Sequence, residues 1–483
     1  MSIVPLGGRA APPPPASDWY EPESPVTGQV LGRVRLWSAE EIAGSLEGDD
    51  GAVLEVPAVA VFAFLGRLRQ ALSAHRQQLI DATLHETGFI VNDCAEMVDG
   101  SIEYLRDFEI HVREGRTTER SIPHSYGSRN RREMRIERRP YHTVAALVPQ
   151  NASLPLSITI VASALSAGSR LLLRPSLQCA ASGALLADLI DRCEPPATSI
   201  RIVNSLAKEF LKASCTAPHI EMIHYIGSNR HALDVFNKAF SARKPCLLDG
   251  QGNGLLYVDD GFEAEEAVRL IVAGATRYNG ETCTSVNGVL THPARFREVQ
   301  EGLVEAVRAL RVGHPADSET QVGPLLSRRQ AEDLAALLTG SPSRRVLCGG
   351  DTDGARFSPA VIEGVELDDV LLREGFFGPA VWIRAIEESA LETWLQANHF
   401  PLSDTILSHR PELIRRFATR SHAARICVNQ DPSIESMFEP WGGYPPGGLN
   451  PVSEWVDKYR QPYQLDGSPL HLSALRDSAF DGA

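Results

Sequence analysis

The stretch that decides the fold covers residues 144–174 and reads VAALVPQNASLPLSITIVASALSAGSRLLLR. It opens with an apolar run that ends at Pro149, and a helix-like pattern follows from about residue 155 to Gly168. A second apolar run then covers residues 170–173. Strand, helix and strand in this order are typical of two parallel strands joined by a crossover helix. The stretch therefore predicts the start of an α/β domain.

The same alternation continues along the chain. Helical periodicity precedes the stretch over residues 56–76 and 76–112. Further helices and strands are expected downstream, at 179–192, 200–203, 206–213 and 222–225. A second alternating block runs to about residue 428, with elements expected at 255–258, 263–276, 286–291, 294–310, 345–348 and 381–383. The pattern predicts two α/β domains that join near residues 244–254.

Length and composition indicate a soluble enzyme of two or three domains, because 483 residues exceed a single compact core. The hydrophobic content is 43% and the charged content 22%, both ordinary for globular proteins. The net charge of −14 argues against nucleic acid as a partner, since nonspecific binding needs a basic surface. Acidic residues also interrupt the local basic cluster at 129–139.

Eight cysteines occur without a CxxC pair or another spacing typical of metal ligands, so no metal site is expected. Their distribution suggests no disulfide framework, which favours a reducing, cytoplasmic compartment. The proline-rich N-terminus lacks the features of a secretory signal and is expected to form a flexible tail. Serines, Gly168 and Arg170 interrupt the apolar run 154–173, so no membrane span is expected.

One cysteine lies in a setting suited to catalysis, within Tyr278-Asn279-Gly280-Glu281-Thr282-Cys283-Thr284-Ser285. Cys283 follows a glycine-containing turn and precedes an apolar, strand-like run. A thiol that attacks a carbonyl must be accessible, and nearby backbone N–H groups must keep it partly as thiolate. The alternative is that Cys283 is a small core residue, which would need none of these features.

Short motifs in a fixed order decide between these readings. They are Pro149-Gln150-Asn151, Leu172–Ser176, Tyr225–Ser228, Gly250–Gly254, the Cys283 turn, Gln321–Leu325, Cys348–Gly350, Glu374–Pro379 and Trp441–Tyr444. In this order and spacing, over about residues 25–470, the chain resembles the aldehyde dehydrogenase superfamily.

The resemblance implies that Cys283 attacks a small-molecule aldehyde, that a hydride leaves to NAD or NADP, and that the thioester is then released. Asn151 matches the family's side-chain donor to the oxyanion, and the Cys283 N–H supplies the second. A catalytically silent scaffold is a minor alternative, which the presence of both residues disfavours. The segment Trp441–Tyr444 is expected to line the substrate tunnel or pack at its rim.

The resemblance also implies the cofactor contacts. They are Val148, Pro149, Arg174, Ser176, Gly227, Ser228, Gly250 and Phe377. Gly227 and Ser228 match the loop that meets the pyrophosphate at a helix N-terminus, although Ala232 replaces a second glycine common in the family. Arg174 replaces a lysine, and Leu177 an acidic residue that would repel a 2′-phosphate, so NADP is expected to be tolerated.

Two departures from the family's hydrolytic members bear on how the acyl group is released. Leu248 aligns with the glutamate that activates water there, and Asp249 lies beside it. Gly250-Gln251-Gly252-Asn253 is similar to the Gly-x-Gly-Asn of CoA-acylating aldehyde dehydrogenases. Glycine at 375 replaces the glutamate that holds the nicotinamide ribose. Release to water and release to CoA or another thiol therefore both remain open, with Asp249 and Glu281 as alternative bases.

The expected architecture is α/β. Residues 1–20 are expected to form the flexible tail, 21–113 and 141–245 a Rossmann-type cofactor domain, 246–430 the catalytic domain, and 114–140 with 455–483 an oligomerisation element. Such an extended arm has no core of its own, so a homodimer or homotetramer is expected.

Overall fold

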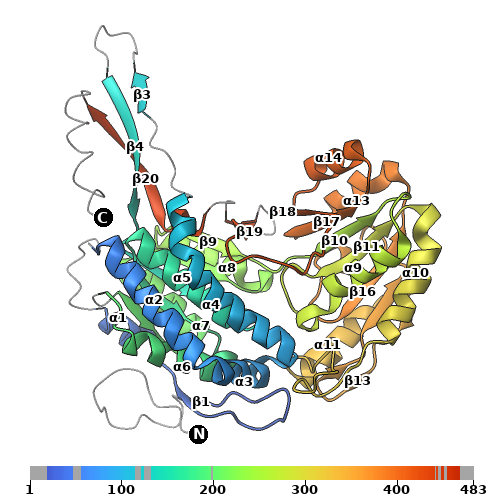
Figure 1. Ribbon diagram of the computed structural model, residues 1–483, viewed down its shortest axis with the longest axis horizontal. Coiled ribbons are helices and arrows are strands. Elements are labelled where there is room, and N and C mark those ends of the chain that lie inside the picture. The colour runs from blue at the N-terminus through green and yellow to red at the C-terminus, as the bar shows by residue number, and fades with distance from the viewer. Residues whose placement is uncertain are drawn as a thin grey trace.

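The computed structural model of the protein shows two α/β units side by side and a β arm that projects from the first (Figure 1). The structure describes residues 19–46, 56–114, 121–124, 132–196, 199–440, 442–443, 448–450 and 454–467. Each unit has its own mainly parallel sheet. The predicted α/β class is therefore confirmed. The expected tail up to residue 18, Trp441 and Tyr444 lie outside the described residues.

The sheet of the first unit has six strands in the order β19-β9-β8-β5-β6-β7, and every neighbouring pair except β19–β9 is parallel. The strands are β5 (Thr143–Leu147), β6 (Arg170–Arg174), β7 (Ile200–Ile202), β8 (Ile220–Ile226), β9 (Cys246–Asp249) and β19 (Gly448–Leu449). All five residues of β5 are buried, as in a strand that helices cover on both faces.

Helices cover both faces of this sheet. The face with the larger apolar cluster is covered by α2 (Ala58–Ala74), α3 (Arg76–Thr87), α4 (Val91–Glu114), α5 (Ser153–Ala167), α6 (Ala180–Arg192) and α15 (Trp455–Lys458). The other face carries α1 (Ala39–Gly44), α7 (Ala207–Thr216) and α8 (Asn229–Ser241). Helix α5 follows β5 and ends at Gly168, whose φ of +91° is the left-handed conformation common after a helix.

The sheet of the second unit has seven strands in the order β12-β15-β16-β11-β10-β17-β18, with only the β12–β15 pair antiparallel. The strands are β10 (Gly254–Val258), β11 (Val286–Thr291), β12 (Arg345–Cys348), β15 (Ala360–Glu363), β16 (Ala380–Ala385), β17 (Ser403–Leu407) and β18 (Arg425–Val428). One apolar cluster includes α9 (Ala264–Thr276) and α10 (Pro293–Arg308). The other includes α11 (Arg328–Thr339), α12 (Val370–Arg373), α13 (Leu391–Ala397) and α14 (Pro411–Arg420).

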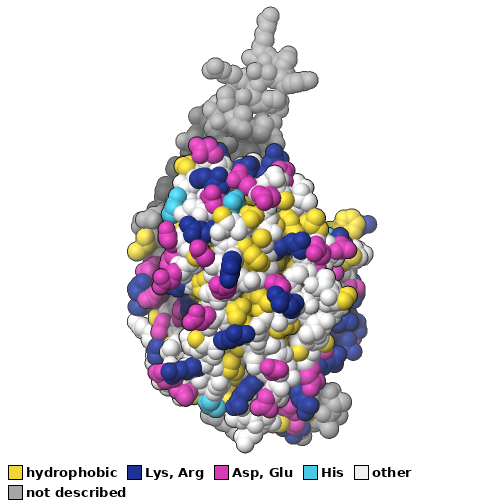
Figure 2. All heavy atoms as spheres, turned by 90° about the vertical axis from the view of Figure 1, so that its right-hand side faces the viewer, with side chains coloured by type: hydrophobic (Ala, Val, Ile, Leu, Met, Phe, Trp, Pro, Cys, Tyr) yellow, Lys and Arg dark blue, Asp and Glu magenta, His cyan; other side chains and the backbone are white. Residues whose placement is uncertain are grey.

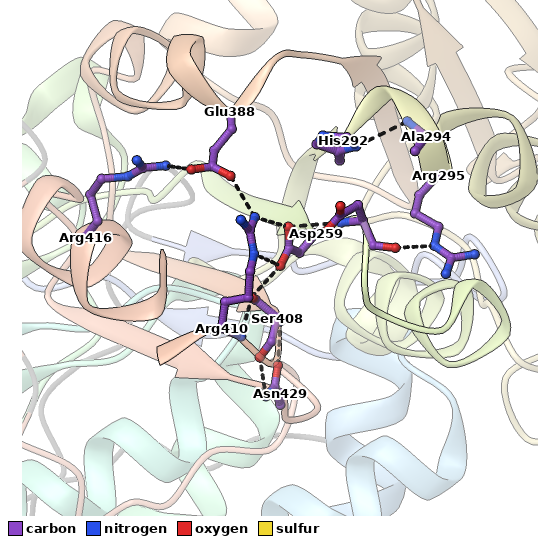
Figure 3. A network of polar contacts seen from close by, with 10 residues as sticks. Asp259, His292, Ala294, Arg295, Glu388, Ser408, Arg410, Arg416 and Asn429 are labelled. Atoms are coloured by element: carbon purple, nitrogen blue, oxygen red, sulfur yellow. Dashed lines mark hydrogen bonds and ion pairs between the residues drawn. The ribbon is translucent and has the colours of Figure 1, made fainter. Parts of the chain in front are cut away.

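A polar network occupies the carboxyl end of this second sheet (Figure 3). Asp259, which follows β10, is buried and accepts hydrogen bonds from the Ser408 hydroxyl at 2.6 Å and from Arg410 Nε at 2.9 Å. The Arg410 guanidinium also reaches Glu388, at 2.7 Å. These contacts tie the loop after β10 to the loop after β17 at this end of the sheet. Cys283 lies at the opposite end, before β11.

The arm is a three-stranded antiparallel sheet in the order β20-β4-β3. It consists of β3 (Ser121–His124), β4 (Arg132–Pro140) and β20 (Arg460–Gly467). Strands β4 and β20 pair from Arg460↔Pro140 to Gly467↔Glu133, so the end of the chain folds back onto a segment far earlier in the sequence. Of the segments expected to form the oligomerisation element, residues 121–124, 132–140 and 460–467 lie together in this sheet (Figure 1), whereas Trp455 and Val456 of α15 pack in the core of the first unit.

The outer face of the second unit carries both signs of charge, interspersed rather than gathered in one patch (Figure 2). Within the described part of the chain, no helix has both the length and the apolar character needed to cross a membrane.

Candidate active site

The backbone before Cys283 is held in an unusual conformation. Tyr278, Asn279 and Gly280 have φ values of 52°, 56° and 64°, three consecutive residues in the left-handed region. Side chains disfavour this region, so surrounding contacts must hold it. At Gly280 a Cβ would collide with the Gly378 carbonyl, and the Gly378 N–H donates to the Gly280 carbonyl at 3.0 Å. Glycine is therefore required at position 280.

The Asn279 side chain supplies much of this restraint. Its amide donates to the carbonyls of Pro324 at 3.0 Å and Gly88 at 3.3 Å, and its oxygen accepts from the Gly323 N–H at 2.8 Å. Gly88 belongs to the first unit, whereas Pro324 and Gly323 belong to the second. Asn279 therefore bonds the turn that carries Cys283 to both units where they meet.

The turn itself closes through two hydroxyl side chains. Ser285 Oγ accepts from the Thr282 N–H at 3.3 Å and lies 2.8 Å from Thr282 Oγ1. Gly252 packs so closely on the Cys283 carbonyl that a Cβ there would collide with it. Cys283 is partly exposed, at the N-terminal end of β11. The turn therefore presents the thiol while fixing its backbone on two sides.

Asn151 reaches this turn from the other unit. It lies in the loop between β5 and α5, and its amide Nδ2 donates to the Glu281 carbonyl at 2.8 Å. Glu281 precedes Cys283 by two residues. Since an amide nitrogen carries two protons, the second remains for an oxygen near the thiol. The structure brings together the two residues expected to be catalytic.

The expectation that the turn keeps Cys283 partly as thiolate is wrong for the free protein. Burial raises the pKa of Cys283 well above its ordinary value, and the carboxylates of Glu435 and Asp249 raise it further. A hydrogen bond from the Cys283 backbone opposes this shift but is the weaker effect. Partial desolvation and negative neighbours therefore favour the neutral thiol.

The residues expected to bind the cofactor gather at one edge of the first sheet. Val148 and Pro149 follow β5, Arg174 ends β6 and Ser176 follows it, Gly227 and Ser228 follow β8, and Gly250 follows β9. In open parallel sheets, ligands bind outside the carboxyl ends of the strands, where the strand order reverses. Here the reversal lies between β5 and β8, beside these residues.

The loop after β8 suits an anionic group. Ser228 caps α8, since its Oγ accepts from the Arg230 N–H at 3.3 Å. The Tyr225 ring lies against Gly227, where a Cβ would collide with it, and the Tyr225 hydroxyl donates to the Ser228 carbonyl at 3.0 Å. The remaining N–H groups of the first turn of α8 are those that meet a phosphate at a helix N-terminus. These residues fit a dinucleotide pyrophosphate.

Arg174 lies beside this loop. Its Nε donates to the Ser205 carbonyl at 3.0 Å. The phenols of Tyr20 and Tyr225 lie close enough to affect the pKa of the guanidinium. Burial lowers the pKa of the guanidinium. No carboxylate among the described residues forms an ion pair with Arg174, and Leu177 is buried nearby in η2 (Leu177–Cys179). The guanidinium therefore lacks a competing acidic partner.

Gly375, which replaces the ribose-binding glutamate of hydrolytic relatives, lies against Asn253 of the Gly250–Asn253 segment. Gly375 has a φ of +69°, and a Cβ there would come within 2.7 Å of the Asn253 Cβ. Asn253 is buried, and its amide donates to the carbonyls of Leu371 at 3.3 Å and Leu372 at 2.6 Å. Glycine at 375 and asparagine at 253 are thus sterically linked. Phe377, two residues on, is half-buried outside the apolar core.

The structure separates the residues expected near the acyl-release step. Leu248 is only 5% exposed and packs in the apolar cluster with Tyr225, so a glutamate there would lie among apolar side chains. Asp249 points to the opposite face of β9, as strand geometry requires. The observed strand therefore separates these adjacent side chains.

Asp249 is bound on all sides. Its carboxylate accepts from His224 Nε2 at 2.7 Å and from Asn450 Nδ2, at 2.7 Å to each oxygen. Burial favours the neutral acid, but the hydrogen bonds from His224 and Asn450 and the charge of Lys458 outweigh it and lower the pKa of Asp249. A low pKa and occupied oxygens make Asp249 a poor base.

Glu281 faces away from the thiol, towards α11. Its Oε1 accepts from Gln330 Nε2 at 2.6 Å. Burial raises its pKa to about 8, although Gln330 and Asn279 partly oppose the shift. Glu281 is thus mainly protonated at neutral pH. Neither alternative base expected from the sequence is well placed to activate water.

A third carboxylate, which the sequence did not single out, lies at the site. Glu435 follows β18 by seven residues; burial raises its pKa, and the Thr284 side chain opposes that shift. It acts on the Cys283 thiol more strongly than Asp249 does. No periodicity or motif marks this residue, because only tertiary structure brings the loop to the nucleophile. Within the described residues, no group of three or more His, Cys, Asp or Glu could hold a metal ion.

Comparison with known proteins agrees with this geometry. A sequence model of the aldehyde dehydrogenase family matches residues 14–462. A non-phosphorylating aspartate-semialdehyde dehydrogenase from Halomonas elongata is 26% identical, covering 88% of this chain and 87% of its own length. A vanillin dehydrogenase from Pseudomonas fluorescens is also 26% identical, covering 93% of this chain and 94% of its own length.

Solved structures share the fold. Glyceraldehyde-3-phosphate dehydrogenase from Methanocaldococcus jannaschii, complexed with NADP, superposes with a TM-score of 0.84 at 21% identity, covering 93% of this chain and 98% of the other. Betaine aldehyde dehydrogenase from Staphylococcus aureus, in complex with NAD⁺, gives 0.85 at 18% identity, covering 94% and 92%. The family match spans nearly the whole chain. The protein therefore belongs to the aldehyde dehydrogenase family, whose members are oxidoreductases that act on aldehydes.

Proposed function

We propose that the protein oxidises a small-molecule aldehyde to the carboxylic acid, with NAD or NADP as hydride acceptor and Cys283 as nucleophile. The observation that carries the proposal is the 2.8 Å hydrogen bond from Asn151 to the Glu281 carbonyl. It holds an amide donor from the cofactor-binding unit beside the nucleophile turn of the other unit. Thiol, oxyanion donor and dinucleotide crevice thus converge where the two units meet.

Cys283 Sγ attacks the aldehyde carbon, and the carbonyl oxygen becomes an oxyanion. The Asn151 amide and the Cys283 N–H stabilise that charge, and preorganised donors of this kind commonly contribute about a hundredfold or more in rate. When bound, NAD or NADP accepts the hydride. Cys283 is left as a thioester, which a second nucleophile then cleaves.

The raised pKa of Cys283 affects the first step. A neutral thiol must lose its proton when the aldehyde binds, because the thiolate is the nucleophile. The positive charge of an oxidised nicotinamide bound beside the thiol would lower the pKa of Cys283 and favour the thiolate. We expect Cys283 to become reactive in the ternary complex rather than in the free protein.

An assay of cofactor reduction tests the proposal. NADH or NADPH formation is followed by absorbance over a panel of aliphatic, aromatic, amino- and carboxy-substituted aldehydes. The Cys283→Ala variant should bind cofactor normally and form no product, because the dinucleotide crevice lies on the other unit. Turnover by that variant above a tenth of the wild-type rate would refute the assignment of the nucleophile.

Release of the acyl group to CoA or another thiol is the second candidate function. The placement of Leu248 in the apolar core favours it, since no base occupies that position. The close contact between Gly375 and Asn253 also supports it, because it leaves no space for a ribose-binding glutamate. Adding CoA to the same assay decides between the two: acyl-CoA formation supports the second candidate, and carboxylate formation indifferent to CoA supports the first.

We also propose that the protein assembles as a homodimer or homotetramer. Helix α8 presents an apolar face to solvent, with Leu233 68% and Phe240 74% exposed and Phe236 stacked on Phe240. In the projecting arm, the outer strand β3 pairs with β4 alone among the residues that the structure describes. Exposed apolar faces and open sheet edges both favour association with a second copy.

A cytoplasmic location is proposed as well. All eight cysteines are free thiols. Free thiols persist in reducing compartments. Fractionation of the source cells, with the protein detected by antibody, tests this directly.

A further inference from the structure

We propose that Glu435 is the general base that activates water for hydrolysis of the Cys283 thioester. The inference rests on the proposed aldehyde oxidation and assigns the acyl-release step to a residue outside the strand where the family's hydrolytic members carry their base. It starts from the finding that Leu248, Asp249 and Glu281 are each unsuited to that task.

A network around Arg425 holds Glu435 in place. Arg425 lies on β18, and its guanidinium donates to the carbonyls of Pro432 at 2.9 Å and Ile434 at 2.6 Å. The same guanidinium lies 3.6 Å from Glu435 Oε1 and 3.2 Å from Glu439 Oε2. Because one arginine binds two carbonyls and two carboxylates, the segment 431–439 is anchored to the second sheet.

The anchored segment lies against the nucleophile turn. Pro432 packs so tightly on Gly274 of α9 that a Cβ there would come within 2.6 Å of its ring. The same Cβ would lie 2.7 Å from Val286, the first residue of β11. Cys283 is three residues earlier. The segment therefore covers the start of β11, next to the thiol.

The Glu435 carboxylate is close enough to the thiol to affect its ionisation. After burial, Glu435 raises the pKa of Cys283 more than any other group does, and the side chain of Thr284, next to Cys283 in sequence, lowers the pKa of Glu435. Its side chain is 29% exposed, so water can reach it. Of the three carboxylates near the turn, Glu435 is the one that combines proximity to the thiol with access to solvent.

The charges around Glu435 suit a base. Burial raises its pKa, and Glu439 raises it further, whereas Thr284, Arg425 and Arg277 lower it. The thiol of Cys427 also faces it from β18. A carboxylate with a raised pKa binds a proton more firmly than an ordinary one, as a general base must.

Hydrolysis of the thioester consumes one water molecule. The oxygen of a water molecule bonds to the thioester carbon while Glu435 takes one of its protons. The C–S bond breaks, the electron pair returns to Cys283 as thiolate, and the carboxylic acid leaves. Glu435 then releases its proton to solvent, so no further reactant is needed.

Rapid mixing of enzyme, NADP and aldehyde tests the assignment with two variants. Glu435→Gln should show a burst of NADPH close to one per active site, because acylation does not need the base. Steady turnover should then fall about a hundredfold or more, the scale of a lost general base. Glu412→Gln, which removes an exposed carboxylate in the first turn of α14, should behave like the wild-type protein.

Hydroxylamine provides the rescue. It attacks thioesters without a protein base, so it should restore steady turnover of Glu435→Gln with hydroxamate as product, while changing the wild type little. Steady turnover of Glu435→Gln within threefold of wild type would overturn the inference. Loss of the burst in Glu435→Gln would also overturn the inference. A rise in KM confined to cationic aldehydes would overturn it too, because it would show that Glu435 recognises the substrate instead. A wild-type protein that reduces no cofactor with any aldehyde refutes the proposed function itself.

Discussion

Replacing Asn279 should destabilise the protein and misplace Cys283 at the same time. Its side chain makes three buried hydrogen bonds, to Pro324, Gly88 and Gly323, and its φ is 56°. At about 1 kcal/mol for each bond, their loss lowers the free energy of unfolding by about 3 kcal/mol. Alanine in the left-handed region adds about 1 kcal/mol, whereas glycine does not.

Two variants separate these contributions. In urea unfolding, Asn279→Gly should lose about 3 kcal/mol and Asn279→Ala about 4 kcal/mol. Hydrogen exchange of the Gly323 amide should accelerate in both, because its acceptor is gone. Both should lose roughly a hundredfold in kcat/KM if the thiol moves by about 1 Å. An alanine variant that keeps wild-type stability and a protected Gly323 amide would refute the restraint inferred for Asn279.

Four further predictions follow from the same geometry. Asn151→Ala should slow the hydride-transfer step about a hundredfold, as measured by single-turnover kinetics, with unchanged affinity for NADP. Arg174→Ala should raise KM for NADP more than for NAD, and equal effects would make it a packing residue. Phe240→Asp should shift the mass measured by light scattering to a smaller species, and an unchanged mass would remove α8 from the interface. Glu281 has a folded-state pKa of about 8, above its unfolded value of about 4.5, so wild-type stability should fall from pH 5 to pH 8. Glu281→Gln should flatten that slope in urea titrations at several pH values.

Much of the fold was predictable because local patterns encode it. The stretch 144–174 folds as β5, α5 and β6 within a few residues of the expected bounds, since buried parallel strands must be apolar and Gly168 must end the helix. Most of the cofactor contacts that the family resemblance implies follow strands of the first sheet, so they lie at one edge of it, because loops at the carboxyl ends of parallel strands converge. Chain order alone is enough to place Asn151 beside the Cys283 turn once the family is recognised.

The acidic environment of the thiol was not predictable from sequence. The state of Asp249 depends on His224, Asn450 and Lys458, which lie 25, 201 and about 209 residues away and act through buried contacts. Glu435 lies in an irregular loop without periodicity, which Arg425 and the packing of Pro432 against α9 hold in place. Turn chemistry suggested a thiolate, but burial and charge at long sequence separation decide the pKa.

The return of the chain to the first unit has a consequence for its synthesis. Strand β19 completes the first sheet beside β9, and β20 pairs with β4, yet both are made after the whole second unit. At about 5–20 residues per second, the roughly 200 residues between β9 and β19 need about 10–40 s. Throughout that interval the ribosome holds a first unit with an open strand edge at β9. The nascent protein is therefore most exposed to mispairing, and most in need of protection by a chaperone, while its catalytic unit is being translated.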